Sequence, residues 1–100
     1  MFISIERDGS LALREPDDFK RLHIETADSD MPLDKVRDAL ASIATFDQNN
    51  FWIDVTSLKA LGRAGDAAWE QSFDAMIKSV QKFGWLSPDG QRVRSHLKSK

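Results

Sequence analysis

Alternation of apolar and polar residues marks two short strands at the start of the chain. Apolar residues alternate with polar ones at Ile3 and Ile5, and again after Gly9 at Leu11 and Leu13. A three-residue loop with Gly9 in the left-handed conformation pairs Ile5 with Leu11. The same register pairs Ile3 with Leu13 and places all four apolar side chains on one face, whereas a one-residue slip would expose half of them. We therefore predict a bulged N-terminal β-hairpin.

Two amphipathic patterns further along the chain predict helices. Over residues 33–45, apolar residues recur at spacings of three and four after Pro32, which suits the start of a helix. The second helix is predicted over residues 66–83, since Asp66 is a good N-cap and Gly84 suits a C-terminal stop. Its apolar stripe consists of Trp69, Phe73, Met76, Ile77, Val80 and Phe83. We expect both helices to pack on a small antiparallel sheet.

Shorter segments complete the predicted fold. Residues 51–55 are bulky and β-branched and predict a strand, followed by a brief helix that is capped by Thr56 or Ser57 and closed by Gly62. Residues 85–94 predict a C-terminal hairpin around Pro88-Asp89-Gly90. The expected fold is α+β, in one domain of residues 1–100 with a frayed tail at 95–100.

The predicted order from residue 33 onward is helix, strand, short helix, long helix and hairpin. This order resembles that of a winged helix-turn-helix domain, with residues 62–65 as the turn and Pro88-Asp89-Gly90 at the tip of the wing. The resemblance implies nucleic-acid binding. However, Asp66, Glu70 and Asp74 occupy the N-terminal half of the long helix and would repel phosphate where base contacts are usually made.

Composition narrows the class of protein. The chain has 100 residues, of which 41% are hydrophobic and 30% charged, so it can bury one core and does not have the composition of a disordered chain. No apolar run approaches the ~20 residues needed to span a bilayer. The chain has no cysteine, which excludes disulfides and thiolate metal sites. We expect a cytoplasmic protein with no membrane partner.

Charge is segregated along the chain. The net charge is −2, yet residues 77–100 hold six bases against Asp89 as their single acid. A basic segment of this kind attracts anionic partners. Its bases are Lys78, Lys82, Arg92, Arg94, Lys98 and Lys100.

The motifs of common catalytic sites are missing from the sequence. It contains no phosphate loop, dinucleotide fingerprint, nucleophile elbow or zinc spacing, so we predict no catalytic residues, no cofactor and no metal. The spacing of His23 and His96 does not place them near one another. Asp54 interrupts an apolar strand: it either faces outward by simple alternation or points inward. In the second case its charge needs a backbone donor or a cation, for which Arg63 or a C-terminal arginine is the candidate.

Three tryptophans are the unusual feature of the composition. Trp52, Trp69 and Trp85 either fill the core or anchor a partner. Trp85 is the best anchor, because it follows the helix stop and lies beside the basic segment. The candidate binding residues are Trp85, Phe83, Trp52, Lys78, Lys82, Arg92, Arg94 and His96.

These observations favour a non-catalytic binding or assembly domain whose partner is another protein or a second copy of the chain. The alternative is a winged-helix-like nucleic-acid-binding module that uses the basic segment for phosphates and Trp85 for stacking. A third reading is a small enzyme or ligand-binding protein. It requires a concave pocket that brings two of a small set of groups within hydrogen-bond reach of one another. That set is Asp54, His23, His96, Arg92, Arg94 and several surface carboxylates.

Overall fold

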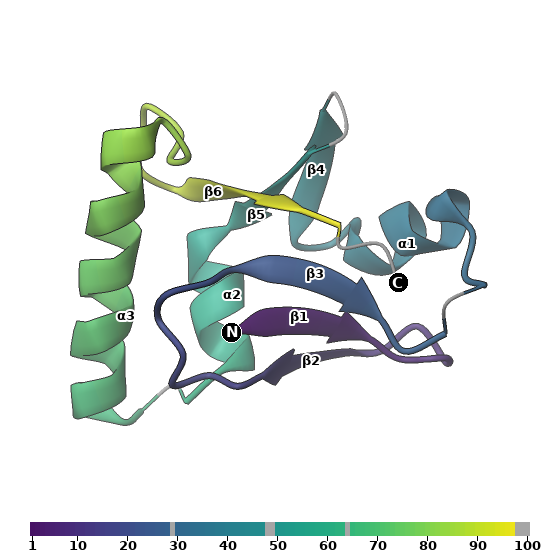
Figure 1. Ribbon diagram of the computed structural model, residues 1–100, viewed down its shortest axis with the longest axis horizontal. Coiled ribbons are helices and arrows are strands. Elements are labelled where there is room, and N and C mark those ends of the chain that lie inside the picture. Colours follow the sequence, from purple (N-terminus) through teal and green to yellow (C-terminus); the bar gives the residue numbers. More distant parts are fainter. Residues whose placement is uncertain (29, 48–49, 64, 98–100) are drawn as a thin grey trace.

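The chain folds into two three-stranded sheets with helices packed against them (Figure 1). The structure, a computed structural model, describes residues 1–28, 30–47, 50–63 and 65–97. The first sheet has the order β2-β1-β3 and the second the order β4-β5-β6. The strands are β1 Phe2–Ile5, β2 Leu11–Arg14, β3 His23–Thr26, β4 Ala44–Asp47, β5 Asn50–Asp54 and β6 Arg92–His96. The helices are α1 Leu33–Leu40, α2 Val55–Leu61 and α3 Ala67–Val80, followed by the 3₁₀ turn η1 Gln81–Phe83. The predicted α+β class is confirmed.

The N-terminal hairpin has the predicted register. Ile3 pairs with Leu13 and Ile5 with Leu11. Gly9 adopts a φ of 88°, in the left-handed region that glycine tolerates. The three-residue loop is closed by two hydrogen bonds of 2.9 Å: the Glu6 N–H donates to the Ser10 carbonyl oxygen, and the Gly9 N–H donates to the Glu6 carbonyl oxygen. The apolar face of the hairpin therefore decided the register, as expected.

The prediction of one antiparallel sheet is wrong in two respects. β3 pairs with β1 in parallel, and the chain forms two sheets that meet edge to edge. An isolated parallel bridge between Ile24 and Leu97 joins β3 to the end of β6 (Figure 1). The local alternation around Ile24 predicts a strand, but it does not carry the identity of that strand's neighbour.

The first predicted helix is shorter than expected. It ends at Leu40 rather than residue 45, and residues 44–47 form β4. Ala44 and Phe46 are half-buried while Thr45 and Asp47 are exposed, which is the two-residue period of a strand. Pairing with β5 uses that alternation, so sheet formation prevailed over continuation of the helix.

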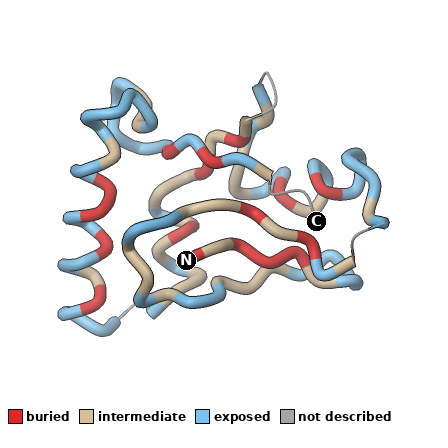
Figure 2. The backbone as a smooth tube through the Cα atoms, viewed as in Figure 1, coloured by how far each residue is buried: buried red, intermediate tan, exposed pale blue. Residues whose placement is uncertain are grey.

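The core lies between the two sheets and the helices. Figure 2 shows buried residues along β1, on the inward side of α3 and within β6. The fully buried set includes Ile3, Ile5, Ile24, Phe51, Ile53, Leu58, Phe73 and Val93. Trp69 belongs to this core, and its indole Nε1 donates to the carbonyl oxygen of Pro16 at 2.8 Å. One of the three tryptophans is therefore a core residue whose polar group is satisfied.

The end of α3 departs from the predicted stripe. Trp69, Phe73, Met76 and Ile77 are buried, but Phe83 is 65% exposed. The helix passes into the tighter η1 turn after Val80, and Gly84 stops it with a φ of 74°. This ending turns Phe83 away from the core.

Gly62 closes α2 at a crowded position. A Cβ atom there would lie 2.5 Å from Cη2 of Trp69 and 2.9 Å from Cδ2 of Leu13. We predict that Gly62→Ala lowers the free energy of unfolding by about 1–3 kcal/mol, as overpacking typically does. Urea unfolding followed by circular dichroism measures this, with the exposed neighbour Arg63→Ala as control. Equal stability of the two variants would contradict the close packing of Gly62 against Trp69 and Leu13.

Candidate functional site

The outer face of the second sheet carries an aromatic and basic row. Side chains of alternate strand residues point to opposite faces. Phe51 and Val93 are buried, so their neighbours Trp52 and Arg94 face outward. Trp52 pairs with Arg94 on one side and with Thr45 on the other. The row therefore crosses β4, β5 and β6.

Trp85 extends this row beyond β6. The peptide N–H of Arg94 donates to the carbonyl oxygen of Trp85 at 2.7 Å, and Leu86 forms an antiparallel bridge with Val93. Trp85 thus lies opposite Arg94, and the Arg94 guanidinium carbon is 5.9 Å from the centroid of the Trp85 ring. Phe83 packs beside Trp85 with ring centroids 5.0 Å apart. We call Trp52, Arg94, Trp85 and Phe83 the aromatic row.

A compact turn holds Trp85 against β6, as the sequence predicted. Ser87 N–H donates to the carbonyl oxygen of Arg92, and Arg92 N–H donates to the Ser87 hydroxyl. Asp89 accepts hydrogen bonds from the Ser87 hydroxyl at 2.6 Å and from the Gln91 N–H at 3.0 Å. These hydrogen bonds lower the pKa of Asp89, with the Ser87 hydroxyl the largest cause.

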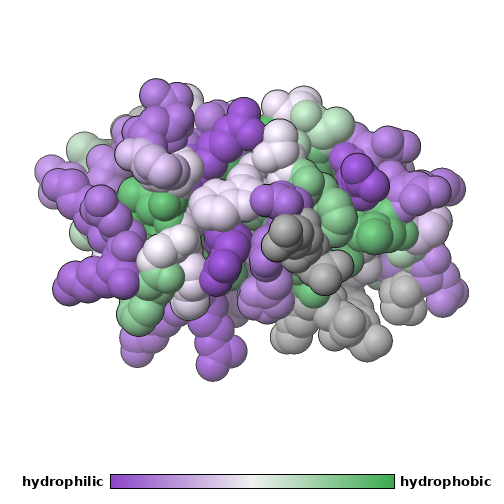
Figure 3. All heavy atoms as spheres, turned by 90° about the horizontal axis from the view of Figure 1, so that it is seen from above, coloured by the Kyte–Doolittle hydropathy of each residue, from purple (hydrophilic) through white to green (hydrophobic). Residues whose placement is uncertain are grey.

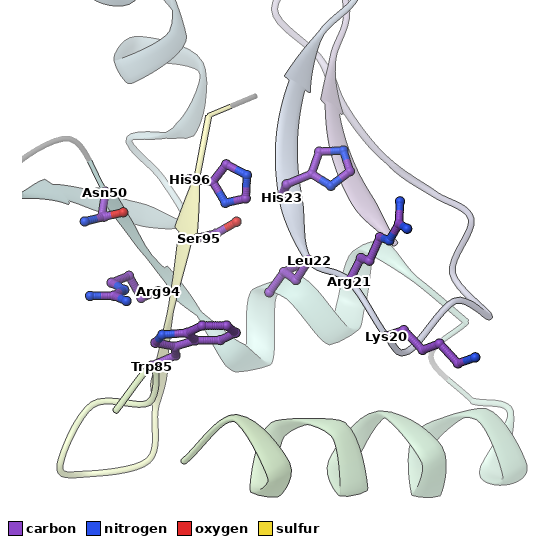
Figure 4. A pocket seen from close by; sticks show the side chains of 9 residues that line it. All are labelled: Lys20, Arg21, Leu22, His23, Asn50, Trp85, Arg94, Ser95 and His96. Atoms are coloured by element: carbon purple, nitrogen blue, oxygen red, sulfur yellow. The ribbon is translucent and has the colours of Figure 1, made fainter. Parts of the chain in front are cut away.

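A cleft of about 410 Å³ opens beside the aromatic row, where β3 and β6 diverge from the Ile24–Leu97 bridge (Figure 4). It collects residues from both sheets. Its lining residues are Lys20, Arg21, Leu22, His23, Asn50, Trp85, Arg94, Ser95 and His96. Three predicted binding residues, Trp85, Arg94 and His96, meet here.

The cleft is positively charged although the chain is acidic overall. Its lining residues include one lysine, two arginines and two histidines but no carboxylate, whereas the whole chain has a net charge of −2. Lys20 and Arg21 come from the segment that precedes β3, far in sequence from Arg94. Their contribution was missed by the sequence analysis, because it depends on the two sheets meeting at β3 and β6.

Ser95 places an unpaired hydroxyl in this cleft. The residue is only 3% exposed, and its Oγ has no hydrogen-bond partner. Burying such a hydroxyl without a partner costs about 1–3 kcal/mol. Ser95 occupies the inward row of β6 with Val93, where an apolar side chain would avoid that cost. Figure 4 shows the hydroxyl directed toward the Leu22 and His23 side of the cleft.

The two histidines lie together although 72 residues separate them in sequence. Their ring centroids are 6.1 Å apart. His23 stacks on Phe2 at 5.0 Å, and its Nε2 is 3.2 Å from a Glu25 carboxylate oxygen. His23 is therefore held in place by its own sheet, whereas His96 is exposed on β6.

The remaining predicted binding residues lie outside the cleft. Arg92 donates to the Thr45 hydroxyl at 3.0 Å, on the face of the aromatic row. Lys78 and Lys82 are exposed on α3 and η1 and do not line the cleft. The prediction of a frayed tail at 95–100 is wrong for its first three residues, because Ser95 and His96 pair with β5 and Leu97 bridges to Ile24. Lys98 and Lys100 lie outside the described residues. The binding candidates thus divide between the sheet face and the helix.

Asp54 serves a structural role. It is half-buried and caps α2, accepting from the Ser57 N–H at 3.0 Å and from the Ser57 hydroxyl at 2.7 Å. The expected partner Arg63 instead lies 3.2 Å from Asp17. The prediction that Thr56 or Ser57 caps this helix was wrong, because Asp54 supplies the acceptor from the end of β5.

Comparison of the chain with protein-family models, curated proteins and solved structures gives no match. Across residues 1–28, 30–47, 50–63 and 65–97, no three metal-ligating side chains gather in one group. Within those same ranges no helix has the length and apolarity to cross a membrane. The winged-helix order is not reproduced either, since two strands, β4 and β5, separate α1 from α2. The cleft and the aromatic row are therefore the features of this fold that bear on function.

The cap assignment predicts the behaviour of Asp54 variants. Asp54→Ala is expected to lower the free energy of unfolding by about 1 kcal/mol, because it removes the acceptor for Ser57. Asp54→Asn retains a side-chain oxygen and is expected to keep most of that stability. Urea unfolding of both variants tests the assignment. An Asp54→Ala variant of unchanged stability would return Asp54 to the candidate site residues.

The hydrogen bonds of the turn predict a low pKa for Asp89. Its folded-state pKa lies below the usual aspartate value, so its contribution to stability is present above that usual value and is lost as the pH falls through the folded pKa. We expect NMR titration to place the Asp89 carboxyl below a typical exposed aspartate. Ser87→Ala is expected to move the pKa back up. A normal titration in the unmodified chain would rule out the turn hydrogen bonds.

Proposed function

We propose that this chain is a non-catalytic binding domain and that its partner is a single strand of nucleic acid. The main observation in support is that Trp52, Arg94 and Trp85 form one row on an open sheet face, at the mouth of a cationic cleft. Proteins that bind single strands combine aromatic platforms with a positively charged groove. Both parts are adjacent in this fold.

The aromatic part of the surface is available for stacking. Trp85 is 40% exposed and Phe83 is 65% exposed. Among the residues that the structure describes, three large hydrophobic residues are exposed, and these are two of them. Figure 3, which views the molecule from above, shows hydrophilic residues over most of the visible face, with smaller apolar patches among them. Exposed rings within a polar surface are typical of binding sites rather than of packing.

The cationic part of the surface provides contacts for phosphates. Lys20, Arg21 and Arg94 line the cleft, and Arg92 lies on the same sheet face as Arg94. The sheet face also carries two acids, Asp47 on β4 and Asp54 on β5, and the Asp54 carboxylate is occupied by the α2 cap. The positive charge therefore belongs to the lining of the cleft, which includes no acidic residue. Such contacts release counterions and weaken as salt rises.

The long helix α3 is poorly suited to enter the major groove of duplex DNA and contact its bases. Its apolar face is buried in the core, and Lys59 of α2 pairs with Asp74 at 2.9 Å on another side. Glu70 also lies in its first two turns, 3.8 Å from the same lysine, so two carboxylates stand where a recognition helix would approach phosphates. The sheet face offers flat stacking for unpaired bases, which a duplex does not expose. We therefore place the partner on the sheet and not on α3.

A second copy of the chain is the competing partner. The segregation of acidic residues toward the N-terminal part and basic residues toward the C-terminal part would allow two copies to attract one another. In that case the aromatic row would be buried in a dimer. Light scattering after size-exclusion chromatography distinguishes the two partners, because it measures the mass of the protein without nucleic acid.

The proposal predicts which variants lose binding. Fluorescence anisotropy with labelled 12-nucleotide RNA and DNA strands, at about 50 mM salt, measures affinity. Trp85→Ala and Arg94→Ala are each expected to weaken binding about 10-fold or more, and Trp85→Phe much less, because stacking on an aromatic ring is retained. Arg63→Ala and Lys35→Ala, both exposed and remote from the cleft, serve as matched charge controls.

Three results would contradict this function. The first is an absence of strand binding at low salt, and the second is equal affinity for duplex and single strand. The third is a stable dimer that Trp85→Ala converts to a monomer, which would assign the aromatic row to self-assembly.

A further inference from the structure

We infer that the cleft between β3 and β6 is a subsite for a phosphate monoester, which would be the terminal phosphate of the bound strand. The inference rests on the proposed function for the identity of the strand. The subsite itself rests on separate observations inside the cleft. They are the unpaired Ser95 hydroxyl, the charge of the lining residues and the closed end of the cleft.

The Ser95 hydroxyl points to a ligand. It is nearly fully buried, has no hydrogen-bond partner, and stands in an otherwise apolar inward row of β6. A hydroxyl can donate to a ligand oxygen, and phosphate oxygens are strong acceptors. A ligand oxygen in the cleft would supply the partner that the protein does not.

The charge of the cleft favours a dianion. Lys20, Arg21 and Arg94 contribute positive charge, and His96 adds a ring that can donate a hydrogen bond. None of the lining residues is acidic. A phosphate monoester carries about −1.5 to −2 charges and three acceptor oxygens, whereas each internal phosphodiester carries about one charge. The Arg94 guanidinium, held over the Trp85 ring, has the planar fork that suits phosphate.

The shape of the cleft favours the end of a strand. The Ile24–Leu97 bridge joins β3 and β6 at one end of the cleft, next to His23 and His96. Trp85 lies toward the other end, with Lys20 across from it (Figure 4). A strand whose last base stacks on Trp85 would direct its terminal phosphate toward the bridged end. A continuous strand could not pass through that end.

The test compares strands that differ only at their ends. Anisotropy is measured with one 12-nucleotide sequence carrying a 5′-phosphate, a 3′-phosphate or hydroxyls at both ends. We expect one phosphorylated end to bind about 10-fold more tightly than the hydroxyl-ended strand. Ser95→Ala and the surface variant Lys20→Ala/Arg21→Ala are expected to lose this preference while still binding the hydroxyl-ended strand. Ser42→Ala, on an exposed serine, is the matched control.

A second measurement tests phosphate binding at the subsite independently of strand binding. Inorganic phosphate and a nucleoside monophosphate are titrated into the protein, and the amide NMR signals of Ser95 and His96 are followed. Shifts that saturate and that Ser95→Ala weakens would support the subsite even if no strand binds, in which case the proposed function fails and a free phosphate ester is the ligand. Strand binding that depends on Trp85 but not on end phosphorylation would overturn the subsite alone. An absence of both responses would overturn both.

Discussion

The register of β6 is the constraint on which the candidate site depends. Val93 is paired with Ile53 of β5 and bridged to Leu86, so the strand has neighbours on both sides. This pairing turns Val93 and Ser95 inward and Arg94 and His96 outward. A slip by one residue would bury arginine and expose valine, which the core would not tolerate. Hydrophobic burial thus fixes the positions of the polar side chains that form the cleft.

The parts of the fold that were predictable from sequence are those that local patterns specify. The hairpin register around Gly9, the Asp66 cap of α3 and the Gly84 stop all follow from short-range alternation or capping chemistry. The parallel pairing of β1 with β3 and the division into two sheets were not predictable in this way. They depend on contacts between distant segments, which leave no periodic signal in the chain.

The candidate site shows the same division. Trp85, Arg94 and His96 were identified because they lie close together in a basic aromatic segment. Lys20, Arg21 and Ser95 were not identified. The first two come from a loop that only the tertiary structure brings to β6, and Ser95 fell in the segment predicted to fray, which pairing with β5 instead holds in the sheet. Asp54 was noticed for interrupting an apolar run, yet its carboxylate serves the start of α2. An unusual residue in a pattern can therefore mark a cap as readily as a site.

The hydrogen bond from Trp69 to Pro16 has a consequence for the cleft. It ties the start of the loop that carries Lys20 and Arg21 to the buried ring of α3, and Phe19 of that loop lies 6.3 Å from the same ring. Lys20 and Arg21 are thereby attached to the hydrophobic core instead of lying on a free loop. Because the loop is already ordered, less conformational entropy is lost when an anion binds in the cleft. The core contacts of α3 thus preorganise the cationic side of the cleft.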